Sequence, residues 1–201
     1  DYSVPRKPRI IFRFLTGAPV RSSPAVSPAG NIYFGSDDNF FYALSRTGEL
    51  LWKKQTGGAV VSSPAIYKNL VIFGSQDSCI YVFSTDGKLK WKKKLPDWIT
   101  TSPVVTEKGE IYIGCENGCL YAFSPEGNLL FSYQSKGEIF SSPALDKKGN
   151  IYFGSEDHHI YCLKRNGELF WRYPTGNFVS ASPCIGEEGR VIIDNIRKVI
   201  T

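Results

Sequence analysis

Short apolar runs separated by polar turn residues follow one another along the chain. Residues 60–93 show the pattern clearly, with runs at Val60–Ile66, Leu70–Gly74, Cys79–Ser84 and Leu89–Lys93. The breaks between these runs contain Asn, Asp and Gly, which are typical of tight turns between antiparallel strands. No stretch of ten residues has apolar residues at the three- and four-residue spacing of a helix. The pattern therefore predicts an all-β protein built of short hairpins.

The pattern of four runs repeats about every 40 residues. Ser-Pro pairs end at Pro24, Pro64, Pro103, Pro143 and Pro183, which are spaced by 40, 39, 40 and 40 residues. A glycine follows each of the first four prolines by ten or eleven residues, and a tyrosine follows that glycine by seven. An aromatic residue precedes every proline by twelve positions. Features that recur in phase in this way indicate an internal structural repeat.

Four short strands in each unit are typical of a β-propeller blade. A β-sandwich would also be all-β, but it does not account for a repeat in phase. We therefore predict a single β-propeller domain over residues 1–201, with five blades of four strands each. The repeats span about residues 16–55, 56–94, 95–134, 135–174 and, in part, 175–201.

The two ends of the chain bear on whether such a propeller closes. Residues 10–14 match the fourth, outermost strand of a blade, whereas the fifth repeat has two strands, an irregular third and no fourth. Asp194 stands where the other repeats have glycine. One interpretation is that strand 10–14 completes the last blade and closes the ring, which would hide exposed sheet edges. The other is that the chain is a segment of a larger ring whose function lies in the remaining blades.

The segments that run from each repeated tyrosine to the next aromatic residue carry a family resemblance. They read YALSRTGELLW, YVFSTDGKLKW, YAFSPEGNLLF and YCLKRNGELFW, beginning at Tyr42, Tyr81, Tyr121 and Tyr161. With the preceding SSPA and IYFGS segments, they resemble the repeats of the pyrroloquinoline-quinone (PQQ)-like β-propeller family, in its non-catalytic branch. The resemblance implies an extracytoplasmic location, since an exported lipoprotein that helps to assemble outer-membrane barrels shares this repeat.

In that family the Gly-x-x-x-Trp unit is a docking motif that ties neighbouring blades together. The resemblance assigns this role to Gly48 and Trp52, Gly87 and Trp91, Gly127 and Phe131, and Gly167 and Trp171. Phe131 replaces the tryptophan of the other repeats, and this replacement is expected to weaken the contact at one junction between blades. Physical chemistry supports a structural role, because glycine fits a tight turn with positive φ and a large ring covers apolar area between sheets.

Composition and charge exclude several classes of protein. Of the 201 residues, 42% are hydrophobic and 14% are aromatic, which does not fit a disordered chain. No apolar run approaches the ~20 residues of a membrane-spanning helix. The formal net charge is +5, and many of the lysines fall on or near outermost strands, where charge protects an exposed edge from pairing. Basic residues do not converge on one face with stacking aromatics, so nucleic-acid binding is not expected.

Few residues are candidates for catalysis or metal binding. PQQ enzymes use a bound quinone with calcium, a catalytic aspartate and commonly adjacent cysteines, and the chain has no Cys-Cys pair. Asp38, Asp77 and Asp157 recur with Asn117 at one turn position, where an Asx side chain bonds its own backbone. His158 and His159 are adjacent on a strand and point to opposite faces. We predict no catalytic residue, cofactor or metal, and keep a quinoprotein or other small-ligand enzyme as the alternative.

The five cysteines leave the redox compartment undecided. Cys115 and Cys119 flank a hairpin turn, and free half-buried thiols are favoured there over a strained cross-strand disulfide. Cys162 and Cys184 replace alanine-like positions and are expected to fill the core. An odd count leaves at least one thiol outside any intrachain pair.

The loop that enters each innermost strand is the best candidate for a binding surface. Four residues before each proline the chain is always aliphatic, which predicts a core row of Val20, Val60, Ile99, Ile139 and Val179. The flanking positions vary, and they include Arg21, Trp98, Phe140 and Phe178. In a propeller these loops gather on one face, so the four side chains are predicted to form an aromatic-rich surface that anchors a partner. The first hypothesis is therefore a non-enzymatic scaffold for protein–protein interaction.

Overall fold

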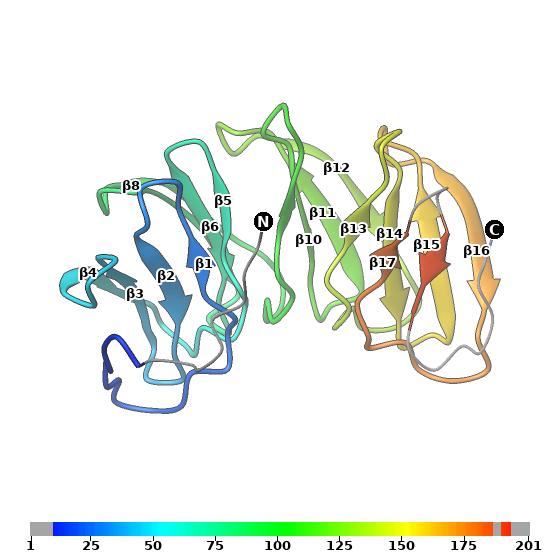
Figure 1. The fold of residues 1–201 in the computed structure, drawn as a ribbon. Helices are drawn as coiled ribbons and strands as arrows, with labels where there is room; N and C mark the ends of the chain where they lie inside the picture. Colours follow the sequence, from blue (N-terminus) through cyan, green and yellow to red (C-terminus); the bar gives the residue numbers. More distant parts are fainter. Residues whose placement is uncertain (1–9, 187–189, 194–201) are drawn as a thin grey trace.

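The computed structural model describes residues 10–186 and 190–193, which form a series of antiparallel sheets (Figure 1). These residues contain no helix, and so none that is long and apolar enough to cross a membrane. The all-β prediction is confirmed. The predictions on Asp194 and on the end of the fifth repeat concern residues outside the described ranges.

Each of the first four repeats forms one sheet whose four strands pair in chain order. The first sheet contains β1 (Ala25–Val26), β2 (Ile32–Gly35), β3 (Phe40–Leu44) and β4 (Leu50–Gln55). The second contains β5 (Ala65–Tyr67), β6 (Leu70–Gly74), β7 (Cys79–Ser84) and β8 (Leu89–Lys94). The third contains β9 (Val104–Val105), β10 (Ile111–Gly114), β11 (Cys119–Phe123) and β12 (Leu129–Gln134). The fourth contains β13 (Ala144–Leu145), β14 (Ile151–Ser155), β15 (His159–Leu163) and β16 (Leu169–Pro174). The fifth sheet has two described strands, β17 (Cys184–Ile185) and β18 (Val191–Ile192).

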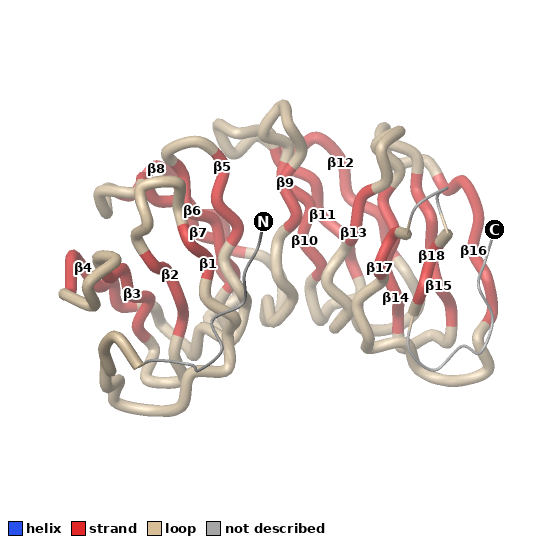
Figure 2. The backbone as a smooth tube through the Cα atoms, in the orientation of Figure 1, coloured by secondary structure: helices blue, strands red, loops and turns tan. Residues whose placement is uncertain are grey.

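The five sheets follow one another in an arc (Figure 2). In each of the four complete sheets, the short first strand lies on the inner side of the arc and the long fourth strand lies on the outside. This is the arrangement of propeller blades around a central axis. The third strand of each complete blade meets the fourth with a shift of register at the same repeat position, for example between Val82 and Phe83.

The inner strands are shorter than the apolar runs predict. Only the end of the run Val60–Ile66 belongs to β5, because the residues before Ala65 make their hydrogen bonds elsewhere. The Ser62 hydroxyl accepts a hydrogen bond from the N–H of Gly74 at 3.0 Å. Pro64 has no N–H to contribute to a ladder.

The serine before each of these prolines links neighbouring blades. Its backbone N–H donates to the hydroxyl of the equivalent serine in the next blade, at 2.8–3.0 Å. The four successive links join Ser23 to Ser63, Ser63 to Ser102, Ser102 to Ser142 and Ser142 to Ser182. These links therefore join all five blades at the points where the chain enters the inner strands.

The hydrophobic core lies between adjacent sheets. The rings of Phe41 in β3 and Phe73 in β6 stack with their centroids 3.9 Å apart. The predicted core row is buried at Val60, Ile99, Ile139 and Val179, each of which packs over a glycine at or next to the end of the second strand of the preceding blade. The prediction is wrong for Val20, which is 45% exposed, because no preceding blade covers it in the described residues.

The motif glycines receive aromatic rings from the preceding blade. Trp52 packs on Gly87, Trp91 on Gly127 and Phe131 on Gly167, and the three glycines have φ values of 86°, 87° and 88°. The indole N–H groups of Trp52 and Trp91 also donate to carbonyl oxygens of the next blade, at 3.0 and 2.8 Å. Phe131 lacks that donor but keeps the ring contact. Trp171 packs against Tyr152 of its own blade, with ring centroids 5.8 Å apart.

The first of these glycines, Gly48, receives the ring of Phe12. Residues 10–14 therefore lie against the first blade, where the outer strand of a preceding blade would contact it. Phe14 adds edge contacts to Phe34 and Tyr42. The segment is nevertheless not a strand, and among the described residues β18 pairs only with β17. The described residues thus do not show the predicted completion of the last blade by strand 10–14, although Phe12 occupies the place on the first blade that the outer strand of a preceding blade would take.

Candidate interaction face

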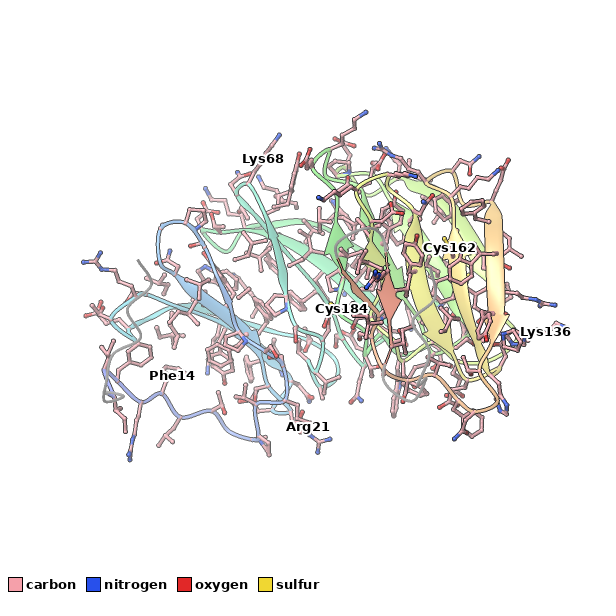
Figure 3. All side chains as sticks on the ribbon, turned by 45° about the vertical axis from the view of Figure 1, so that its right-hand side comes forward. Phe14, Arg21, Lys68, Lys136, Cys162 and Cys184 are labelled. Atoms are coloured by element: carbon pink, nitrogen blue, oxygen red, sulfur yellow. The ribbon has the colours of Figure 1, made fainter. Side chains whose placement is uncertain are left out.

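The loops that enter the inner strands share one side of the arc with the turns between second and third strands. We call this side the entry face, formed by loops 16–24, 56–64, 95–103, 135–143 and 175–183 and by turns 36–39, 75–78, 115–118 and 155–158. It is the lower side in Figure 1, and Figure 3 shows Arg21 there, with Lys68 on the opposite side. Backbone hydrogen bonds of 2.9–3.0 Å hold loop and turn together in four blades, for example from the N–H of Glu116 to the carbonyl of Trp98.

A repeated aspartate bonds the entry loop to its own blade in the first, second and fourth blades. In the second blade, Asp77 accepts hydrogen bonds from the Tyr81 hydroxyl at 2.6 Å and from the N–H of Gly57 at 2.8 Å. Burial alone would raise the pKa of Asp77, but these bonds and one from the N–H of Cys79 outweigh it and lower the pKa. Asp38 and Asp157 hold the same position, and Asn117 bonds Tyr121 in the third blade. The three aspartates therefore combine the predicted turn role with a bond to the entry loop, which Asn117 does not make.

The Asp77 bonds should make the fold sensitive to acid. Because the pKa of Asp77 is lowered on folding, its carboxylate stabilises the fold above its unfolded pKa of about 4, and this stabilisation is lost as the pH falls through the folded pKa. We expect Asp77→Asn to lower the free energy of unfolding by about 1–2 kcal/mol at neutral pH, and by much less in acid, where the wild-type carboxyl is also neutral.

Urea unfolding at neutral pH and near pH 2 measures both values, since the contribution of the carboxylate is lost as the pH falls through its folded pKa. Glu107→Gln, which removes an exposed acid from the opposite side, serves as the control. An equal loss from Asp77→Asn at both pH values would mean that the carboxylate charge contributes nothing.

The four residues predicted to form a binding surface all lie in entry loops. Trp98 and Phe178 are 49% and 54% exposed, and Phe140 is half-buried. Phe178 contacts the His158 ring edge to face, with centroids 4.8 Å apart. Arg21 lies on the first blade, where it forms a 2.8 Å ion pair with Asp37. The structure thus places the three aromatic residues on blades three to five and the arginine on the opposite part of the arc.

The remaining candidate groups have structural surroundings. All five cysteines are free; Cys162 is buried as predicted, but Cys184 is exposed, so the prediction that it fills the core is wrong. It lies on β17, whose blade has only two described strands to cover it. His159 bonds the Asp157 carbonyl at 2.8 Å. Among residues 10–186 and 190–193, no three His, Cys, Asp or Glu side chains are grouped as metal ligands would be.

A cavity of about 390 Å³ opens on the side opposite the entry face. The turns after β9 and β13 line it, with Val105 and Leu145 beside Lys108, Lys147 and Lys148. Arg165 closes one wall and pairs with Glu110 of the neighbouring blade at 2.7 Å. No aromatic side chain lines this cavity, so it offers no ring on which a quinone could stack.

Comparison with known proteins agrees with this architecture. The PQQ_2 family model, described as outer membrane protein assembly factor BamB, matches residues 7–138, which is more than half of the chain. The chain belongs to this family. As a PQQ-like repeat protein, it has the propeller fold that the blade pattern predicts, and this prediction is confirmed. A search of the curated proteins gave no significant match.

Two solved structures show how far the likeness of this PQQ-like protein extends. The crystal structure of BamB from Moraxella catarrhalis matches 89% of the chain with a TM-score of 0.76 and 14% identity. The computationally designed Ika8 protein matches 85% of the chain with a TM-score of 0.74 and 18% identity. The chain spans little more than half of each of those proteins, 56% and 54% respectively. At these identities the likeness establishes the fold.

Sequence reasoning missed the acidic residues of the entry face. Glu116 and Glu156 occupy the repeat position of Asp37 and Gln76, and Glu138 occupies that of Trp98. The sequence does place these glutamates at equivalent positions of the repeat. Those positions indicate a shared acidic surface only when the loops and turns are known to meet on one face.

Proposed function

We propose that the protein is a non-enzymatic propeller scaffold that binds a protein partner through its entry face. The observation that carries this proposal is the exposure of Trp98 and Phe178 beside fully packed neighbours. Ile99 and Val179, the next residues in the chain, are buried between blades. Each exposed ring is therefore held on a fixed backbone, which is the property of residues that dominate protein interfaces.

Comparison within the repeat supports the same view. The positions of Trp98 and Phe178 are occupied by Pro19, Ala59 and Glu138 in the other loops, so the blades do not need an aromatic ring there. The BamB-like family is consistent with a scaffold that contacts proteins. By the same resemblance we propose an extracytoplasmic location, and we propose that residues 1–201 act as a single domain. We include no cofactor, nucleic acid or membrane span in the proposal.

Partner capture tests the proposed function. The double variant Trp98→Ala/Phe178→Ala should lose capture of the wild-type protein's partners, and binding to each recovered partner should weaken by more than about tenfold when remeasured with pure components. The melting curve should be unchanged, because both side chains are half exposed. Leu89→Ala/Leu129→Ala is the matched control, since both leucines are about half exposed on outer strands. If the aromatic variant binds as the wild type does, the entry face is not the interface.

A further inference from the structure

The exposed aromatic residues occupy one continuous part of the entry face. Trp98 lies in the loop that enters the third blade, Phe140 in the next loop, and Phe178 in the loop that enters the fifth. Trp98 and Phe178 are about half exposed, and Phe140 is half-buried between them. The corresponding loops of the first and second blades carry no aromatic side chain. The aromatic part of the entry face is therefore confined to blades three to five.

Carboxylates are interleaved with these rings. The N–H of Glu116 donates to the carbonyl of Trp98 at 3.0 Å, and the N–H of Glu156 donates to that of Glu138 at 2.9 Å. Ile139, the neighbour of Glu138, packs on Gly114 two residues before Glu116, which brings the two pairs together. Burial raises the pKa of Glu116, and the nearby carboxylates of Asp97, Glu138 and Glu156 raise it further. Thr100 holds the Glu116 carboxylate in place with a 2.8 Å hydrogen bond.

The charge of the entry face is opposite to that of the whole chain. Its loops and turns contain eight carboxylates, at Asp37, Asp38, Asp77, Asp97, Glu116, Glu138, Glu156 and Asp157, and two cations, at Arg21 and Lys136. The chain as a whole carries +5. Arg21 pairs with Asp37 at 2.8 Å, so the first blade is locally balanced. Most of the entry-face carboxylates without such an ion pair in the described residues are therefore on blades three to five, beside the exposed rings.

We propose that this acidic and aromatic part of the entry face binds a basic segment of a protein partner. Lysine or arginine side chains of that segment would pair with Glu116, Glu138 and Glu156 and lie against the rings of Trp98 and Phe178. Carboxylates attract cations over several ångströms, and aromatic faces bind the same cations at close range. Complementary charge also steers encounter and selects among partners. This inference rests on the proposed function and specifies the chemistry of the partner.

A charge-matched pair of variants tests the inference. The probe is a short fluorescent peptide of alternating lysine and serine, with an alternating glutamate and serine peptide as its counterpart. Glu116→Gln/Glu138→Gln/Glu156→Gln removes three charges from the entry face. Glu49→Gln/Glu107→Gln/Glu126→Gln removes three exposed charges from turns on the opposite side. Both variants have the same net charge, so the long-range attraction of the whole protein for the peptide changes equally.

Fluorescence anisotropy at low ionic strength gives the dissociation constants. The wild type should bind the lysine peptide and not the glutamate peptide. The entry-face variant should bind the lysine peptide about tenfold more weakly than the control variant does, and added salt should weaken wild-type binding. Equal binding by the two variants would overturn the inference, as would the absence of lysine-peptide binding by the wild type.

The outcomes separate this inference from the proposed function. If Trp98→Ala/Phe178→Ala loses partner capture while the glutamate-to-glutamine variant keeps it, the face is an interface and the partner's basic character is refuted. If both variants capture partners normally, the proposed function itself fails.

Discussion

Trp91→Ala is expected to lower the free energy of unfolding by about 3–5 kcal/mol, the usual loss for a large aromatic side chain removed from a packed site. The indole packs on Gly127 of the next blade, where a Cβ atom would lie only 2.7 Å from its Cδ2. Its N–H donates to the carbonyl of Pro125 at 2.8 Å. The substitution removes both contacts and opens a cavity between the second and third blades. Because Trp91 is half-buried, we expect a value toward the lower end of that range.

Trp91→Phe provides the control for this prediction. It keeps a ring over Gly127 and removes only the N–H, as Phe131 does naturally at the next junction. We expect it to cost about 1 kcal/mol, the net contribution of one hydrogen bond. Denaturant unfolding followed by far-ultraviolet circular dichroism measures both variants. A loss below about 1 kcal/mol for Trp91→Ala would show that the ring contributes little to holding the blades together.

The repeat made the fold predictable because its physical causes are local. Turn glycines, alternating strands and the spacing of the prolines all recur in each unit, and each unit needs its neighbour to bury its apolar face. The aliphatic row was predictable for the same reason: Ile99 and Val179 occupy equivalent places between blades. The prediction failed at Val20, where the described structure supplies no neighbouring blade.

Features that depend on contacts between repeats were harder to predict. Ser63 and its equivalents link the blades, but a single repeat does not indicate this role. The backbone N–H donor and the hydroxyl acceptor of each link lie about 40 residues apart in the sequence. The acidic character of the entry face was missed for a similar reason. Glu116, Glu138 and Asp97 are separated in the sequence and meet only when loop and turn are placed on one face.

A glycine at or next to the end of the second strand shapes each junction between neighbouring blades. Gly35, Gly74, Gly114 and Gly154 leave the space that the next aliphatic residue fills. The four described junctions therefore share one packing rule, in which a glycine of one blade makes room for a buried aliphatic side chain of the next blade.

Gly35→Ala tests that packing rule directly and is expected to cost about 3 kcal/mol or more, since overpacking against backbone cannot be relieved by a change of rotamer. A Cβ atom at this position would collide with Cγ1 and with the carbonyl oxygen of Val60, and that residue is fully buried. Gly35 does not have a positive φ, so the loss of unfolding free energy would come from the steric clash and not from backbone strain. Gly186→Ala is the matched control, because its added Cβ would meet atoms no closer than 3.7 Å. Urea unfolding compares the two variants, and a loss below about 1 kcal/mol for Gly35→Ala would show that this junction does not require glycine.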